Sequence, residues 1–341
     1  MKTGEPDIYI SRKRCPFEKP EKEELFFSLM DYRHNLFTSN DPEKIIEFYD
    51  GFENCDELVE WMRERPKGAS YIHEVEGDKD IIVVIPTADF NGKDAKECRE
   101  NIFKGLHMIF VESGEIPDPY FNVAHNANVG MKRALKYNPK WIVSSGDDMY
   151  KIDEIENLRE NLNGLDNRNV DVVFTAPTKY HSTLSILGVP RSIFFHATRI
   201  FSRFSKTVNI TYLTLKTLRR FNNMIYIPRT NFKVNVVNRF LNFLFLRPVK
   251  HFTNILSFSI FSSEFVRECK GEIFDEIYIN EMEDTDLSIR LTSTNKKSAV
   301  IDFKIGEYVS SSLGTGLMRR IRTVPGLSYF SYKVQMGVIY L

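Results

Sequence analysis

Two adjacent acids, Asp147 and Asp148, stand where a short apolar run ends. The run comprises residues 141–143 (WIV), and the small residues 144–146 (SSG) separate it from the acids. An apolar run that stops abruptly in small residues is typical of a buried strand reaching the edge of a sheet. A turn after the glycine would let both carboxylates face one point. Their hard oxygen atoms suit Mg²⁺ or Mn²⁺, and the structural alternative is a solvated turn in which Asp148 caps the next helix.

A second acidic group lies near the C-terminal end of the chain. Between Glu281 and Asp286, four of six residues are acidic, and an amphipathic helix with apolar positions Leu287, Ile289 and Leu291 is expected to follow. We predict that Glu283 or Asp284 is the N-cap of this helix. Mutual repulsion and partial burial would raise a carboxyl pKa here, whereas the helix N-terminus would lower it. A helix start decorated with acids is the structural alternative.

Strand and helix patterns alternate around the acid pair. We expect strands at 81–85, 108–111, 141–143 and 172–174, and helices at 94–107, 124–135 and 155–162. The strand ends carry acids at Asp89, Glu112 and Asp147/Asp148. Because open α/β sheets bind ligands at the carboxyl ends of their strands, we predict a nucleotide-binding α/β unit. Neither GxGxxG nor GxxxxGK[ST] occurs, which argues against a dinucleotide fingerprint or a P-loop.

The formal net charge of zero hides a strong asymmetry. Residues 191–250 contain twelve Lys or Arg and no Asp or Glu, so the other residues carry 34 basic against 46 acidic side chains. Nine Phe are interleaved with these basic residues, a pattern that favours a membrane surface with anionic headgroups. One alternative is a core-packing subdomain whose basic residues are exposed. Nucleic acid is not expected as a partner, because no binding module is recognisable.

The remaining composition indicates a reducing compartment. The four cysteines are far apart and form no CxxC pair, which indicates neither a zinc site nor a disulfide framework. Residues 1–30 are too charged for a secretory signal peptide, and no apolar run is long enough to span a bilayer. We therefore expect a cytoplasmic protein held peripherally on the inner face of the membrane.

Four segments carry a family resemblance and occur in this order: IIVVIPTAD, NANVGMKRA, SSGDDM and FDEIYINEMEDTDLSIRL. Together they resemble an inverting family 2 glycosyltransferase of the GT-A fold, over about residues 80–185 and 255–325. The resemblance implies that Asp147 and Asp148 bind Mn²⁺ or Mg²⁺ and that Asp284 is the general base. It also implies that the nucleotide-sugar donor contacts Glu112, through its nucleobase, and Thr87, Asp89 and Asp147.

The chain departs from the family pattern at several positions. The usual DxD motif begins with Asp, but the corresponding residue here is Ser145 or Gly146. The alignment of the metal-binding motif with this sequence can therefore shift by one residue. Glu112 stands where Asp is commoner, and Ala88 replaces an aromatic residue. Two alternatives to transfer therefore remain: an inactive, membrane-peripheral nucleotide-sugar-binding protein on the same fold, or a sugar nucleotidyltransferase.

The expected architecture is an α/β GT-A (Rossmann-like) domain with a mixed, mainly parallel sheet flanked by helices. We place an N-terminal arm and helical extension at 1–79, the GT-A domain at 80–325 with a basic helical insertion at 188–252, and an apolar C-terminal segment at 326–341. The expected partners are a nucleotide-sugar donor, a glycan or lipid-phosphate acceptor and an anionic membrane surface.

Overall fold

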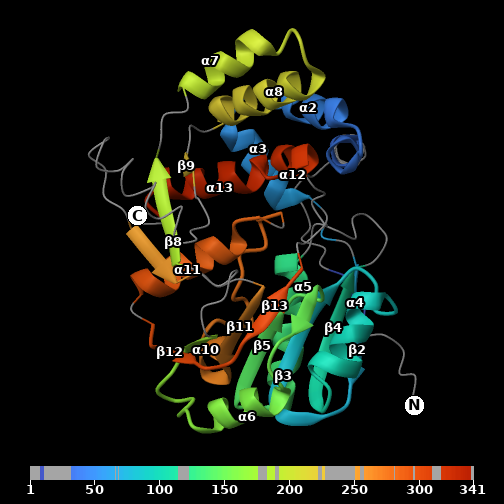
Figure 1. Ribbon diagram of the computed structural model, residues 1–341, viewed down its shortest axis with the longest axis vertical. Coiled ribbons are helices and arrows are strands. Elements are labelled where there is room, and N and C mark those ends of the chain that lie inside the picture. The colour runs from blue at the N-terminus through green and yellow to red at the C-terminus, as the bar shows by residue number, and fades with distance from the viewer. Residues whose placement is uncertain are drawn as a thin grey trace, which may run out of the picture.

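The computed structural model consists of a mixed β-sheet with helices on both faces and a separate layer of helices beyond it (Figure 1). The described residues are 8–10, 32–65, 67, 69–113, 123–175, 183–188, 192–221, 225–226, 250–253, 257–279, 281–294, 296–308 and 316–338. Within these ranges, no helix is both long enough and apolar enough to cross a membrane.

The main sheet has eight strands and is mainly parallel. In spatial order they are β1 (Ile8–Ile10), β2 (Ala69–Val75), β4 (Leu106–Ser113), β3 (Asp78–Thr87), β5 (Trp141–Ser145), β11 (Phe258–Ser262), β7 (Val172–Thr175) and β12 (Ser298–Ile301). The central strand β3 pairs in parallel with both β4 and β5, while β2 and β11 run antiparallel to their neighbours. The sheet therefore includes β1 and β2, which both lie upstream of the boundary predicted at residue 80.

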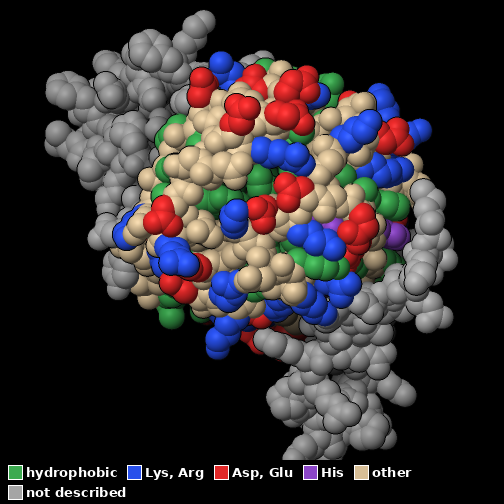
Figure 2. All heavy atoms as spheres, turned by 90° about the horizontal axis from the view of Figure 1, so that it is seen from below, with side chains coloured by type: hydrophobic (Ala, Val, Ile, Leu, Met, Phe, Trp, Pro, Cys, Tyr) green, Lys and Arg blue, Asp and Glu red, His purple; other side chains and the backbone are tan. Residues whose placement is uncertain are grey.

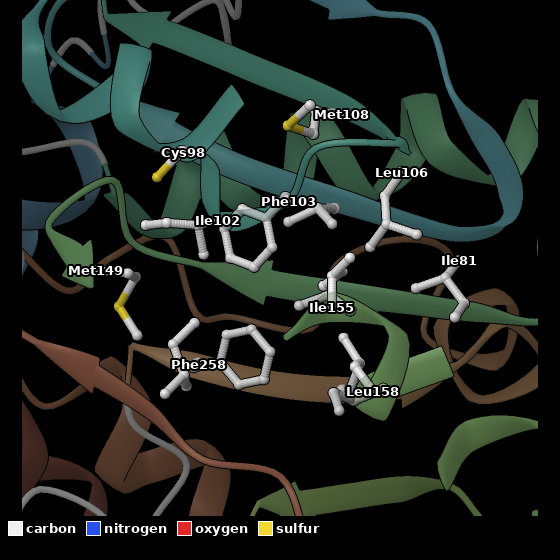
Figure 3. Close-up of a cluster of buried hydrophobic side chains, with 14 of the residues drawn as sticks. Ile81, Cys98, Ile102, Phe103, Leu106, Met108, Met149, Ile155, Leu158 and Phe258 are labelled. Atoms are coloured by element: carbon white, nitrogen blue, oxygen red, sulfur yellow. The ribbon is translucent and has the colours of Figure 1, made fainter. Parts of the chain in front are cut away.

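Both faces of the central strands are buried, as the continuous apolar runs predicted. Side chains of β3 alternate between two core clusters, with Ile81, Val83 and Ile85 on one face and Ile82 and Val84 on the other. Figure 3 shows the first of these clusters, in which Phe103 and Phe258 stack with 6.2 Å between ring centroids. Such two-sided burial is typical of parallel strands covered by helices.

Helices cover the two faces of the sheet. They are α4 (Lys93–Glu97), the one-turn π-helix η1 (Cys98–Ile102), α5 (Val123–Ala134), the 3₁₀ turn η2 (Leu135–Tyr137), α6 (Ile155–Asn163), α10 (Ser263–Glu268) and α11 (Glu283–Ser293). The helix predicted at 94–107 is wrong in extent. It ends at Ile102 because Gly105, at φ +91°, turns the chain into β4.

A second layer of helices packs around its own apolar core. It contains a helical segment at 32–38 and the helices α2 (Pro42–Asp50), α3 (Cys55–Glu64), α8 (Lys206–Phe221), α12 (Gly316–Arg322) and α13 (Val324–Gln335). Asp41 caps α2 and Asn54 caps α3, each through a side-chain oxygen that accepts a backbone N–H. Segments from the start, middle and end of the chain thus share one core.

The remaining elements are small. β6 (Met149–Lys151) pairs with β13 (Ile305–Glu307), and a three-stranded sheet contains β10 (Lys250–Thr253), β8 (Thr183–Gly188) and β9 (Ile225–Tyr226). In the predicted insertion at 188–252, α7 (Ser192–Phe201) and α8 are helical. Residues 227–249 of the insertion lie outside the described residues.

An ionic cluster joins α11 to the helical layer. The buried ammonium of Lys333, on α13, lies 2.6 Å from Asp286 Oδ2 on α11 and 2.9 Å from Asp275 Oδ2. Tyr329 also donates a hydrogen bond to Asp275. Burial alone would raise the pKa of Asp275, but Lys333 and the hydrogen bonds to this carboxylate hold the pKa below its ordinary value.

We predict that Lys333→Met destabilises the protein strongly. The substitution removes the cation but leaves two largely buried carboxylates, a situation that typically costs about 3 kcal/mol or more. Urea unfolding at pH 7 measures the loss. Lys132→Met is the matched control, because Lys132 forms an exposed ion pair of similar length with Glu272, worth at most about 1 kcal/mol. Equal losses in the two variants would contradict the structural role of Lys333.

Candidate functional site

The acid pair lies at the carboxyl edge of the main sheet. Because β3, β4 and β5 run in parallel, their C-terminal ends meet at this edge. Thr87, the last residue of β3, is paired directly with Glu112 of β4. Asp147 and Asp148 follow the end of β5, where the chain turns into β6. The strand arrangement predicted from the sequence therefore places these side chains at one end of the sheet.

Thr87 forms hydrogen bonds with two other predicted site residues, Asp147 and Asp89. Its hydroxyl donates a hydrogen bond to Asp147 Oδ2 at 2.7 Å and accepts one from the Asp89 backbone N–H at 3.2 Å. The Asp89 carboxylate itself accepts from the backbone N–H of Asn91, in the turn before α4. Asp147 is thus oriented by Thr87, whereas the side chain of Asp89 stabilises a turn.

Asp148 folds back over Gly146. A Cβ atom on Gly146 would lie only 2.7 Å from Asp148 Oδ1, so the absence of a side chain creates room for the carboxylate. The backbone N–H of Gly146 donates to Ser257 O at 2.8 Å, and that of Tyr308 donates to Asp148 O at 2.8 Å. These bonds tie the acidic turn to the start of β11 and to the end of β13.

Negative charge is concentrated around this turn. Burial, followed by repulsion from Glu307 and Asp147, raises the pKa of Asp148 to about 7. Burial also raises the pKa of Asp147, against the hydrogen bond from Thr87, which lowers it. Glu307 is brought here by the pairing of β13 with β6, so no local sequence signal could have identified it. Perturbed acids at a strand edge are typical of functional sites.

Glu112 is already bonded within the protein. One carboxylate oxygen lies 2.6 Å from His73 Nε2, and the other accepts from the backbone N–H of Phe90 at 3.2 Å. The Phe90 ring stacks on His73 with centroids 4.3 Å apart, and the Arg99 guanidinium lies 4.7 Å from the same ring. A nucleobase at Glu112 would therefore meet an aromatic and cationic stack. Sequence analysis missed Phe90, although its place two residues after Ala88 was a usable signal.

The second acidic group lies at the start of α11. The helix begins at Glu283, so Met282 occupies the N-cap position and the prediction of Glu283 or Asp284 as the cap is wrong. Met282 adopts φ +78°, and its carbonyl accepts from the Asp286 backbone N–H at 2.8 Å. A non-glycine residue in this conformation is strained, and such strain is typical of functional sites.

The four acids of this group have different roles. Asp286 is fully buried and belongs to the ionic cluster around Lys333, so its role is structural. Asp284 Oδ1 accepts from the Thr285 backbone N–H at 2.6 Å. Burial, followed by repulsion from Asp284, raises the pKa of Glu283. At Glu283 these two effects outweigh a backbone hydrogen bond and the charge of Arg319, which lower the pKa.

The segment before α11 connects the carboxyl edge to the helical layer. Glu276 lies 2.8 Å from His125 Nδ1 and accepts from Asn128 at 3.0 Å, and both partners lie on the N-terminal half of α5. The neighbouring Asp275 contacts Lys333 of α13. On α11, Leu287 packs in the same core cluster as α5 and the side chains of β3 and β5 on one face of the sheet. The acids of α11 therefore lie on an element fixed to both layers.

Asp147 and Asp148 are suitable donors for a hard divalent cation. Both offer carboxylate oxygens, and the uncompensated negative charge around Asp148 would be relieved by a cation. Among the described residues, no three His, Cys, Asp or Glu side chains are arranged to hold a metal ion. A cation at this turn would thus depend on the substrate or on water for its other ligands, as Mg²⁺ commonly does.

We predict that Asp148→Asn stabilises the protein in a pH-dependent way. Because the folded-state pKa lies near 7 and an unfolded Asp titrates near 4, the folded protein binds this proton more tightly. Its free energy of unfolding therefore falls as pH rises from about 4 to about 7. The variant has no carboxyl group at this position and does not lose this stability. The difference in free energy of unfolding between variant and wild type should therefore be on the order of 2 kcal/mol larger at pH 8 than at pH 5.

Urea unfolding at the two pH values, without divalent cations, measures this difference. Asp302→Asn is the control, because Asp302 is exposed and its substitution should leave stability nearly unchanged at both pH values. Equal gains for Asp148→Asn at pH 5 and pH 8 would show that its carboxyl titrates normally.

Comparison with known proteins gives no match that identifies the chain. No protein-family model matches it, and no curated protein matches it. The function is therefore inferred from the residues at the carboxyl edge of the sheet and at the start of α11.

Proposed function

We propose that this protein is a metal-dependent inverting glycosyltransferase of the GT-A type. It would move a sugar from a nucleotide-sugar donor to a hydroxyl or phosphate of a glycan or lipid-linked acceptor. The observation that carries the proposal is the acid pair Asp147 and Asp148 at the carboxyl edge of a mainly parallel sheet, where Thr87 orients Asp147. Ligands of open α/β sheets bind at this edge.

Residues at the acid pair would bind the donor diphosphate. Asp147 and Asp148 would hold Mn²⁺ or Mg²⁺, which when bound neutralises charge on the nucleoside diphosphate leaving group. Thr87 fixes the rotamer of Asp147 through its hydrogen bond, and Gly146 leaves room for the Asp148 carboxylate. Glu112, oriented by His73 and the Phe90 backbone, has further lone pairs on its two carboxylate oxygens and would accept hydrogen bonds from the nucleobase.

Residues at the start of α11 would activate the acceptor. Burial and repulsion from Asp284 raise the pKa of Glu283 and favour its neutral form, so Asp284 is the better candidate for the base. A general base needs this ionised form, and Asp284 would take the proton from the acceptor hydroxyl as its oxygen attacks the anomeric carbon. Attack from the face opposite the leaving group inverts the configuration in a single displacement. The ion pair between Lys333 and Asp286 anchors this helix start, where Met282 has a strained backbone.

A non-catalytic nucleotide-sugar-binding protein is the second candidate. It is favoured by the departure from the DxD motif, because Ser145 or Gly146 stands where the first Asp is usual. Metal-dependent binding of nucleotide sugars, with neither hydrolysis nor transfer to any acceptor, would support this candidate over the transferase.

We predict that Asp147→Asn and Asp148→Asn each weaken Mn²⁺-dependent donor binding, because each removes an anionic ligand. Calorimetry with a panel of nucleotide sugars, with and without Mn²⁺, measures the effect at a fixed pH of 8, where Asp148 is ionised. The exposed Asp302→Asn variant should bind as wild type does. Unchanged metal-dependent affinity in both site variants would exclude this metal site.

We predict that Asp284→Asn folds and binds the donor with unchanged affinity but transfers sugar at least about 100-fold more slowly. The isosteric amide keeps the hydrogen bond from Thr285 yet cannot accept the acceptor proton. Glu283→Gln is the matched control and should retain most activity, because the raised pKa of Glu283 favours the neutral form that Gln mimics. An inactive Glu283→Gln beside an active Asp284→Asn would move the base to Glu283.

A further inference from the structure

Large apolar side chains are exposed where α7 ends. Ile200 is 63% exposed, Phe201 58% and Phe204 82%, and Phe204 is the most exposed large hydrophobic residue in the described part of the chain. All three lie within five residues, in the last turn of α7 and the turn that follows. We call residues 199–206 the α7 tip. Exposed apolar groups gathered in this way mark interaction sites in soluble domains.

Other described side chains of the α7–α8 hairpin pack against one another or in the core of the helical layer. Phe195 of α7 lies 5.3 Å from Tyr212 of α8 between ring centroids, and the Arg219 guanidinium lies 5.2 Å from the Phe195 ring. On α8, Ile210 and Phe221 are buried in the core of the helical layer. The hairpin thus uses its inner face for packing, as the core-packing alternative predicted. The apolar side chains of the α7 tip take no part in this packing and are exposed to solvent.

Basic side chains alternate with the exposed apolar ones. Arg199 and Arg203 are exposed at the α7 tip and form no ion pair among the described residues. Lys206 lies at the end of the tip, 3.1 Å from Glu43. Residues 192–221 contain six Lys or Arg and no acid. This segment is therefore complementary to a negatively charged and partly apolar surface.

The α7 tip lies at one extremity of the molecule. Figure 1 shows α7 and the turn after it at the end of the long axis opposite to the main sheet. Figure 2 shows the other end, where acidic and basic side chains are interspersed. A projecting tip can reach a flat surface without a clash from the rest of the protein. A partner peptide, by contrast, usually occupies a groove.

We propose that the α7 tip docks on a bilayer that contains anionic lipid. Ile200, Phe201 and Phe204 insert among the headgroups, and Arg199 and Arg203 contact lipid phosphates. Both components of interfacial binding are present, an apolar one and an electrostatic one. Nucleic acid fits less well, because aliphatic Ile200 cannot stack on a base as an aromatic ring does.

Co-sedimentation with vesicles tests the apolar component. Wild-type protein should bind vesicles of phosphatidylcholine that contain about 30% phosphatidylglycerol. The anionic lipid gives these vesicles a negatively charged surface. Combined Ile200→Ser, Phe201→Ser and Phe204→Ser should lower the partition coefficient at least about ten-fold. The matched control is Val300→Ser on β12, which removes a side chain of similar exposure, 67%, and should leave binding unchanged. Circular dichroism confirms that each variant is folded.

Charge reversal tests the electrostatic component. Arg199→Glu with Arg203→Glu should weaken binding to the anionic vesicles at least about ten-fold and remove most of its salt dependence. Lys104→Glu with Lys136→Glu changes the net charge equally at exposed positions outside the α7 tip and should have little effect. Equal effects of the two double variants would show a response to net charge alone and would overturn the proposal.

Other occupants give different results in the same set of experiments. A dimer in solution that the triple Ser variant dissociates, with no vesicle binding, would assign the α7 tip to a second copy of the chain. Binding to single-stranded RNA that the variants abolish, again without vesicle binding, would assign it to nucleic acid. Either result overturns membrane docking. Because none of these measurements needs a sugar donor, their outcome is independent of the proposed transferase activity.

Discussion

The parallel pairing of β3 with β4 and β5 is the constraint on which the candidate site depends. Hydrogen bonds on both sides of β3 bring three strand ends to one edge and place Thr87 directly opposite Glu112. Each strand is buried on both faces, so its register cannot slip by one residue without exchanging the side chains of two core clusters. The acids after β5 therefore occupy a fixed position beside Thr87.

Gathering acids at this edge opposes stability, and the surrounding structure offsets the cost. Burial and the charges of Glu307 and Asp147 oppose ionisation of Asp148 and raise its pKa to about 7. Packing of the sheet provides the stability that makes such an arrangement tolerable, as is common where function needs a strained or charged site. At the start of α11, the chain adds a strained Met282 and a half-buried Glu283 with a raised pKa. Here Lys333 anchors the helix by neutralising Asp286 and Asp275.

The helical layer has a structural role and also exposes apolar side chains at the α7 tip. Its core unites α2 and α3 with α8 and the C-terminal helices α12 and α13, and Tyr49 of α2 donates a hydrogen bond to Ile321 O of α12 at 2.5 Å. The same hairpin that supplies α8 to this core presents the α7 tip to solvent. In residues 192–221 one set of apolar side chains packs in the core and another is exposed, which is compatible with both the core-packing interpretation and the proposed membrane contact.

Local signals in the sequence determined the central strands, the capped starts of α2 and α3, and the position of Asp147 and Asp148 at a strand end. Each of these depends on neighbours within about one element: an apolar run, a capping side chain or a small residue. The tertiary structure alone decided which distant groups act on the site. Pairing of β13 with β6 brings Glu307 to Asp148, and packing of α13 brings Lys333 to Asp286 in the first turn of α11. These contacts join residues more than 40 positions apart, and no periodicity or spacing in the sequence encodes them.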